Sequence, residues 1–137
     1  MIEVANYLKE HYYPHYGGGT LAPKLVPTNE MLLYALERHS DKVLTVTRNG
    51  QLDGVAIFLT LDDDTYKHLF DFDLSRVDVL ARLLEQEGDN YHFILLTAKG
   101  PNVIRAGLQM AKRMNPKTIS WFNQDMTRLH SRTLRGV

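Results

Sequence analysis

The chain has 137 residues, of which 44% are hydrophobic, and this size and composition fit a single domain over residues 1–137 with its own core. It contains no cysteine, which excludes a disulfide framework and a cysteine nucleophile and favours a reducing compartment. No apolar run approaches the roughly 20 residues of a membrane span and the N-terminus does not resemble a signal peptide, so we expect a cytoplasmic protein without membrane contact.

The N-terminal part predicts a short helix and a loop of unusual composition. Residues 2–10 carry apolar side chains three apart, as in a short amphipathic helix. Residues 12–19 are aromatic and glycine-rich, and we interpret them as a packed, flexible connection or as an aromatic lid over a substrate channel. His11 and His15 stand four apart, but Pro14 intervenes and no third ligand is near. We therefore expect no metal site.

The next stretch predicts a helix and a β-hairpin. Residues 29–39 form the helical pattern, with Thr28 available as the N-cap. Residues 42–48 and 54–61 are strand-like and flank a turn at residues 49–53, which is the pattern of a hairpin.

An acidic run follows the hairpin. Asp62, Asp63 and Asp64 could bind a cation, but successive side chains diverge, so we interpret the run as a solvated turn before an irregular stretch at residues 66–73. Residues 75–87 then predict a helix that opens on the capping-box variant Ser75-Arg76-Val77-Asp78. Its core-facing side chains are expected to be Val77, Leu80, Ala81 and Leu84.

The region after this helix has the order strand, turn, helix, strand. Residues 91–98 are a continuous apolar run about as long as a strand buried on both faces. Gly100 and Pro101 break the run and favour a helix start. Residues 118–122 are β-branched and aromatic and predict the second strand. A mixed sheet with helices on it follows from the complete element order.

The helix between these strands is expected to end at Asn115-Pro116. Gly107 lies in its apolar stripe, where a missing side chain would permit close packing on the sheet. A strand that enters a helix through a glycine-containing loop presents backbone N–H groups and the positive end of the helix dipole at one point. That point suits a pyrophosphate, with Lys99 and Arg105 adding charge, although any strand-helix-strand unit needs such a turn.

Charge is distributed unevenly along the chain. Residues 1–98 hold 15 acidic and 8 basic side chains, whereas residues 99–137 hold 1 acidic and 8 basic, which leaves net charges of −7 and +7. Two interpretations fit this asymmetry: the C-terminal part meets an anion, either a phosphorylated cofactor or nucleic acid, or it is attracted to the rest of the fold. Few aromatic residues and no recognisable nucleic-acid motif argue against nucleic acid.

The helix, the hairpin and the strand-turn-helix-strand unit together resemble the GNAT superfamily of acyl-CoA N-acyltransferases, over residues 28–137. The resemblance implies an α+β fold with a mixed, mostly antiparallel sheet flanked by helices. It also implies acetyl-CoA or another acyl-CoA as co-substrate and an amine as acceptor. The cofactor-binding residues implied are Ala98, Lys99, Gly100, Asn102, Arg105 and Asn123.

The match to the family's cofactor motif is incomplete. That motif is Gln or Arg, two residues, Gly, one residue, then Gly or Ala; Lys99 takes the first place, but Asn102 and Ile104 occupy the small-residue places. After the last strand the family often has Asn and then Arg-Leu-Tyr, and here Asn123 and Arg128-Leu129-His130 follow that pattern. His130 thus replaces the tyrosine that can protonate the departing thiolate.

In such a transfer, the amine must lose a proton and attack the thioester carbonyl. His92 is the candidate base, with a lone core or surface histidine as the alternative. His130 is the candidate acid if the tail is helical; if residues 127–134 form a strand, His130 lies on a sheet face. Trp121 could line the acyl or acceptor pocket or serve only as a core residue.

By its small size, the chain also resembles the compact branch related to toxin-activating lysine acyltransferases, which use a histidine and an aspartate. The candidates by order along the chain are His11 or His15, with Asp62 or Asp64. Two other classes stay open. A non-enzymatic binding or regulatory module with a decayed cofactor site is favoured by the departures at the cofactor motif, and nucleic-acid binding would use the basic C-terminal segment.

Overall fold

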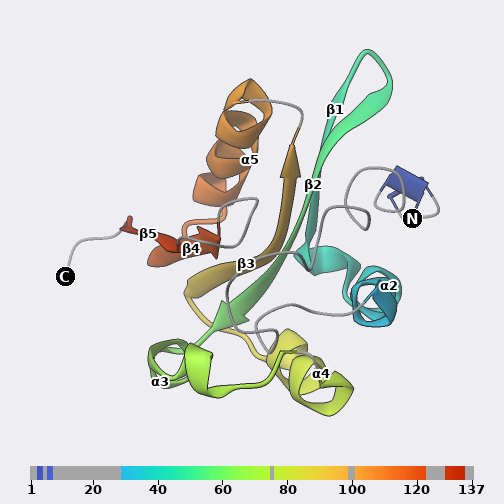
Figure 1. The fold of residues 1–137 in the computed structure, drawn as a ribbon. Helices are drawn as coiled ribbons and strands as arrows, with labels where there is room; N and C mark the ends of the chain where they lie inside the picture. Colours follow the sequence, from blue (N-terminus) through green and yellow to red (C-terminus); the bar gives the residue numbers. More distant parts are fainter. Residues whose placement is uncertain are drawn as a thin grey trace.

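A computed structural model describes Glu3, Val4, Asn6, Tyr7 and residues 29–74, 76–98, 101–122 and 129–134. The helices are α2 (Asn29–Arg38), η2 (Ser40–Lys42), α3 (Asp63–Lys67), η3 (Leu69–Asp71), α4 (Val77–Glu85) and α5 (Pro101–Arg113). The strands are β1 (Val43–Arg48), β2 (Gln51–Leu61), β3 (Asn90–Ala98), β4 (Thr118–Phe122) and β5 (Leu129–Thr133) (Figure 1). The predicted α+β class is confirmed. Lys99, Gly100 and Asn123 lie outside the described residues.

The strands form one five-stranded sheet in the order β1-β2-β3-β4-β5. The pairs β1–β2, β2–β3 and β4–β5 are antiparallel, whereas β3–β4 is parallel. The predicted mixed, mostly antiparallel sheet is therefore confirmed. The parallel pair is joined by α5, as a parallel connection requires a crossover.

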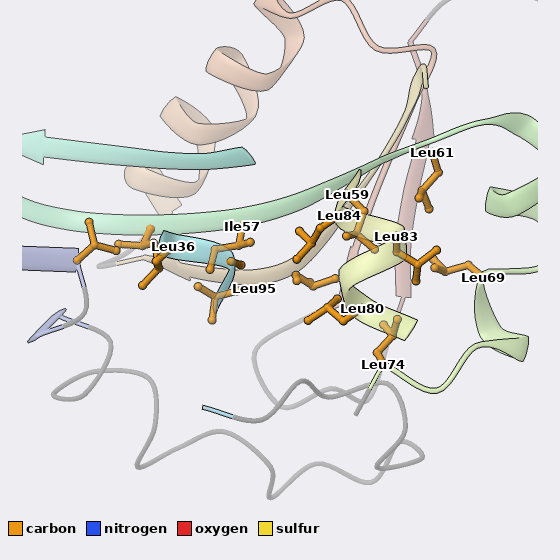
Figure 2. Close-up of a cluster of buried hydrophobic side chains, with 14 of the residues drawn as sticks. Leu36, Ile57, Leu59, Leu61, Leu69, Leu74, Leu80, Leu83, Leu84 and Leu95 are labelled. Atoms are coloured by element: carbon orange, nitrogen blue, oxygen red, sulfur yellow. The ribbon is translucent and has the colours of Figure 1, made fainter. Parts of the chain in front are cut away.

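Helices cover both faces of the sheet. Helix α5 lies on one side, and α2 and α4 lie on the other (Figure 1). On the α2 and α4 side, a leucine-rich core includes Leu36, Ile57, Leu59, Leu80, Leu84 and Leu95 (Figure 2). On the α5 side, a smaller aromatic cluster contains Phe58, Phe93, Ala111 and Ile119, with Trp121 packed against it. The strand predicted to be buried on both faces is β3, and its apolar run fills both layers.

The hairpin is confirmed, but its turn is tighter than predicted. Asn49 and Gly50 have φ angles of 54° and 77°, which fit a two-residue type I′ turn. Gln51 already pairs with Arg48. The predicted five-residue turn is wrong because the extra residue, Asp53, is taken up inside β2 as a bulge, where the register shifts.

The acidic run is the start of a helix. Asp62 is the N-cap of α3, and its carboxylate accepts a hydrogen bond from the backbone N–H of Thr65 at 2.7 Å. Asp63 and Asp64 occupy the first turn, where the helix dipole favours negative charge. The prediction of an irregular stretch after the run is wrong where α3 continues to Lys67.

Helix α4 begins and ends differently from the prediction. Its N-cap is Arg76 and makes no side-chain cap bond, so the predicted capping box is wrong. The Arg76 guanidinium instead donates two hydrogen bonds to the carboxylate of Asp78. Val77 is 54% exposed, against the prediction that it faces the core. The buried residues of the helix are Leu80, Leu83 and Leu84.

Helix α5 ends near the predicted stop, and Asn115 adopts a φ of 58°, in the left-handed region. Gly107 does not provide the predicted close packing. A Cβ built there would meet no atom of the described residues within 4 Å. Contact with the sheet comes instead from Ala111, which is fully buried.

The tail is a strand in its described part. Strand β5 pairs antiparallel with β4, and His130 lies opposite Trp121. The helical alternative for this segment is wrong over Leu129–Thr133, because this stretch completes the sheet next to β4.

Candidate active site

The parallel strand β3 pairs with β4 only over its first four residues, which face four of the five residues of β4. The register runs from Asn90 opposite Thr118 to Phe93 opposite Trp121. Strand β3 then continues to Ala98 with β2 as its partner, whereas Phe122 of β4 pairs with β5. Among the described residues, the two strands share no pair beyond this point. We call the place beyond Phe93 and Trp121, where the described pairs between the two strands stop, the β3–β4 opening.

A β-bulge coincides with the end of pairing. The β2–β3 register passes from Ile57 opposite Leu95 to Phe58 opposite Phe93, so Ile94 is the extra residue on β3. Both Ile94 and Leu95 consequently contribute to the leucine-rich core, whereas Phe93 packs on the α5 side. Bulges bend a strand and increase its twist, so β3 is expected to change direction where its pairing with β4 stops.

Helix α5 starts next to the opening. Ala98 is the last residue of β3, and α5 begins at Pro101, so the amino end of the helix follows the strand closely. Asn102 lies in the first turn, where its backbone belongs to the positive end of the dipole, and its side chain is outside the described set. Arg105 is exposed one turn later. Of the predicted anion-binding residues, the structure thus brings Ala98, Asn102 and Arg105 to this end of the sheet.

His92 lies inside the sheet beside a hydroxyl group. It is 1% exposed, and its Nδ1 is 2.7 Å from the Oγ of Ser120, which is 2% exposed. The two residues are in register across the parallel pair. Burial lowers the pKa of His92 from 6.5 to about 4, because the charged imidazolium is poorly solvated there. The imidazole is therefore neutral at physiological pH.

His130 is the second histidine that the sequence analysis named as a catalytic candidate. Its ring stacks on Trp121 with the centroids 5.3 Å apart and the planes 14° apart. Both side chains are half-buried. Since Trp121 packs against the aromatic cluster, His130 is on the α5 side of the sheet.

The two predicted catalytic histidines face opposite sides of the sheet. His92 contacts Ser120 and His130 contacts Trp121, and consecutive residues of a strand point to opposite faces. They therefore cannot form a hydrogen-bonded pair. An acid and a base on different faces can still serve one group that lies between the strands.

The amino ends of β3 and β4 are held by polar side chains. Buried Asn90 donates to the carbonyl oxygen of Leu61 at 3.1 Å and to the carboxylate of Asp63 at 2.8 Å. Its own carbonyl oxygen accepts a hydrogen bond from the Thr118 hydroxyl at 2.7 Å. Lys117 pairs with Asp63 at 3.1 Å. Hydrogen bonds from Asn90 and Lys117 lower the pKa of the Asp63 carboxyl. We call Asn90, Asp63, Lys117 and Thr118 the amino-end clamp.

Only some basic side chains of the C-terminal part form ion pairs with the acidic part of the chain. The ion pair between Lys117 and Asp63 joins the basic C-terminal part to the acidic remainder. Exposed cations in the basic part include Arg105, Lys112, Arg113 and Arg132. Among the described residues no group of three or more His, Asp or Glu side chains could hold a metal ion. Within the same residues, no helix is long and apolar enough to cross a membrane.

Sequence reasoning missed two residues of this region. Ser120 carried no signal, because only the register of β3 and β4 places it beside His92. Asn90 lay just before the predicted strand, although it starts β3 and is 2% exposed. A buried amide at a strand start is visible only once its partners on β2, α3 and β4 are known.

No protein-family model matches the chain, and no curated protein matches it. The crystal structure of a GNAT family acetyltransferase from Brucella melitensis in complex with acetyl-CoA is similar, with a TM-score of 0.54 and 12% identity over 98% of this chain and 82% of that one. A Drosophila melanogaster polyamine N-acetyltransferase, which forms N-acetylagmatine, matches with a TM-score of 0.48 and 15% identity over 88% of this chain and 69% of that one. The first similarity shows that the fold is GNAT-like.

Proposed function

We propose that this protein is an acyl-CoA-dependent N-acyltransferase, which transfers an acetyl group from acetyl-CoA to an amine of a small molecule or protein. The observation that carries this proposal is the β3–β4 opening, followed directly by the amino end of α5. The similar Brucella fold was crystallised with acetyl-CoA. A site that combines an anion-binding helix start with a gap between parallel strands suits a long, phosphorylated thioester.

The residues present fit this co-substrate at two places. Lys99, Gly100, Asn102 and Arg105 would hold the pyrophosphate at the start of α5, by backbone N–H groups and positive charge. The edge of β3 over residues 95–98 is not paired with β4 and can offer backbone groups to the amides of a pantetheine arm. Asn102 and Ile104, at the places where the motif has small residues, would leave less room for the pyrophosphate.

The proposed chemistry divides the acid and the base between the two faces. Neutral His92 would accept the proton of the attacking amine on the α2 and α4 side. Although His130 lies on a strand and not on the expected helix, it would return a proton to the thiolate on the α5 side, the same side as the helix that would hold the pyrophosphate. In this proposal, two histidines that cannot touch each other would serve one thioester between the strands.

The geometry favours the general N-acyltransferase over the compact toxin-activating branch. Asp62 and Asp64 lie at the start of α3, which follows the end of β2. That end of β2 pairs with Asn90, at the amino end of β3. The β3–β4 opening is at the carboxyl end. Asp62 and Asp64 are therefore at the wrong end of the sheet to partner a catalytic histidine at the opening.

Calorimetry with acetyl-CoA and a radiolabelled acetyl-transfer screen over primary amines and lysine peptides test the proposal together. We expect binding in the micromolar range, abolished by competing CoA, and transfer to at least one amine class. Binding without transfer to any amine would identify the binding or regulatory module instead. A salt-dependent DNA mobility shift without any acetyl-CoA binding would reject the enzyme and support nucleic-acid binding.

A further inference from the structure

The β1–β2 hairpin overhangs the sheet at the end where α5 begins. Gly54 of β2 lies opposite Ala98, the last residue of β3, so the described pairs between β2 and β3 stop before the hairpin turn. Figure 1 shows the tip of the hairpin beyond the end of β3, at the same end as the start of α5. Helix α5 also packs against β1 and β2. The hairpin tip and the amino end of α5 therefore lie at one end of the sheet.

Arg48 is the last residue of β1 and lies on the α5 side of the sheet. Leu44, four residues earlier on the same strand, packs against the aromatic cluster on that side. Residues an even number apart on a strand share a face. The extra residue of the nearby bulge belongs to β2, so the alternation continues along β1 to its end. The guanidinium of Arg48 is thus on the face of the sheet on which α5 begins.

A buried carboxylate holds the Arg48 guanidinium. The Nε atom of Arg48 is 2.8 Å from Oδ2 of Asp53. The Asp53 side chain is 8% exposed, whereas the Arg48 side chain is 66% exposed. Nε carries one of the five donors of a guanidinium, and the other four are on its two terminal nitrogens. The ion pair therefore fixes the base of the fork against the protein and leaves most of the Arg48 side chain in solvent.

The bulge in β2 brings this carboxylate to Arg48. Asp53 is the extra residue between Gly54, which lies opposite Val46, and Leu52, which lies opposite Thr47. Its carbonyl oxygen accepts a hydrogen bond from the Tyr7 hydroxyl at 3.1 Å, which ties down the bulged backbone. Burial of a carboxylate costs free energy that a pair with an exposed cation barely offsets. Stability alone therefore does not account for a buried Asp53, whereas orientation of Arg48 does.

We propose that Arg48 binds the pyrophosphate of the acyl-CoA donor and that Asp53 is its positioning residue. This inference rests on the proposed function. A guanidinium binds phosphate oxygens through paired N–H donors in a fixed plane, which a carboxylate at Nε helps to orient. Arg48 approaches the anion from the hairpin, and the proposed residues Lys99 and Arg105 approach it from the β3–α5 connection and from α5. The pyrophosphate is then held by two parts of the chain that are about 50 residues apart.

The test replaces both members of the ion pair, because Arg48→Gln alone would leave a buried carboxylate without this counter-ion. Arg48→Gln combined with Asp53→Asn leaves the net charge unchanged. Calorimetry on the full chain compares acetyl-CoA with acetyl-dephospho-CoA, which keeps the pyrophosphate but lacks the phosphate on the ribose. We expect the double variant to bind both compounds roughly tenfold more weakly than the wild type. The matched control, Arg76→Gln combined with Asp78→Asn, removes an exposed pair at the start of α4 and should bind normally.

Each outcome decides the inference. Wild-type affinity of the Arg48 and Asp53 double variant for acetyl-CoA overturns it and leaves the proposed acyltransferase intact. A loss seen with acetyl-CoA but not with acetyl-dephospho-CoA also overturns it, because the ribose phosphate would then be the contact. Equal losses in the control pair overturn it as an indirect effect.

Two further results separate folding and function from the inference. If the double variant fails to fold, Arg48→Lys keeps a counter-ion for Asp53 but loses the planar fork, and it should still bind acetyl-CoA more weakly. Wild-type affinity in folded Arg48→Lys overturns the inference in that case. Absence of acetyl-CoA binding by the wild type rejects the proposed function itself.

Discussion

The amino and carboxyl ends of the β3–β4 pair are built in opposite ways. At the amino end, buried Asn90 links β2, α3 and β4 through three hydrogen bonds, and Lys117 adds an ion pair to Asp63. At the carboxyl end, β3 carries a bulge at Ile94 and the described strands share no further pairs. The fold thus concentrates polar bonding at the amino end, whereas the proposed ligand site lies at the other end. Substitutions at the two ends should therefore affect different measurements.

The largest effect is expected at the open end, on turnover. His130→Gln removes the proposed proton donor to the thiolate and should lower turnover by roughly 100-fold to 10,000-fold, about 3 to 5 kcal/mol in activation free energy. Acetyl-CoA affinity should stay near that of the wild type, and His130→Tyr should restore part of the loss. Steady-state kinetics with an amine found in the screen measures this. Full turnover in His130→Gln would remove the acid role.

The next effect is expected at the clamped end, on stability alone. A Cβ at Gly88 would overlap the backbone of Leu61 and Asp62, which cannot yield as a flexible side chain can. Gly88→Ala should lower the free energy of unfolding by about 4 kcal/mol or more. Gly107→Ala is the matched control in α5, where space is free, and should raise stability by about 0.5 to 1 kcal/mol. Urea unfolding of both variants measures these free energies. Equal losses of stability would contradict the close approach of Gly88 to the backbone of Leu61 and Asp62.

Stability should also depend on pH through His92. Its pKa is about 4 in the folded protein and near 6.5 when unfolded, so the unfolded chain binds the proton first as pH falls. The stabilising contribution is complete above pH 6.5 and is lost between pH 6.5 and 4, by roughly 3 kcal/mol in total. Urea unfolding across this range should be steeper in pH for the wild type than for His92→Gln. Parallel profiles would show that His92 is not buried in its neutral form.

A smaller effect is expected from Asn90. Asn90→Ala removes three hydrogen bonds and leaves the Leu61 carbonyl without this donor, which should cost about 2 kcal/mol. Amide hydrogen exchange should rise in β4 before it rises in β1 and β2. Asp63→Ala, at an exposed position of the same clamp, should cost less than Asn90→Ala. If exchange rose equally in all strands, the clamp would not be specific to the parallel pair.

The smallest effect is expected at the open end, on binding. Arg105→Ala should weaken acetyl-CoA binding by about 1.5 kcal/mol, roughly tenfold, which is the lower end for a charge-assisted contact because Arg105 is exposed. Its melting temperature should not change. Lys112→Ala, an exposed cation further along the same helix, is the control and should bind normally. Equal weakening by both variants would indicate a general charge effect.

Local sequence patterns predicted the elements better than their ends. The hairpin around Asn49-Gly50, the apolar run of β3 and the helix stop near Asn115 depend on neighbouring residues, and the structure confirms them. The α3 cap was misread because Asp62, Asp63 and Asp64 suit a solvated turn and a helix start equally well. The bulge at Asp53 was also invisible, because its position depends on the partner strand.

The contacts of the site depended on register and on distant partners. His92 was found from its residue type, but Ser120 required the alignment of β3 with β4. Buried Lys42 appeared to be the first residue of a strand, yet its ammonium group donates to the carbonyl oxygens of Leu84 and Gln86 at the end of α4. Such pairings join residues about 30 to 45 positions apart, and no periodicity in the sequence reports them.

The position of the parallel pair also fixes an order of folding. Strands β1, β2 and β3 are consecutive antiparallel neighbours that can pair as soon as they emerge during synthesis. Strand β4 can join only after the crossover through α5 is complete, and until then the apolar β3 is an exposed edge open to pairing with other chains. The amino-end clamp contains Lys117 and Thr118, at the start of β4. Its formation therefore coincides with the step that protects the nascent sheet from aggregation.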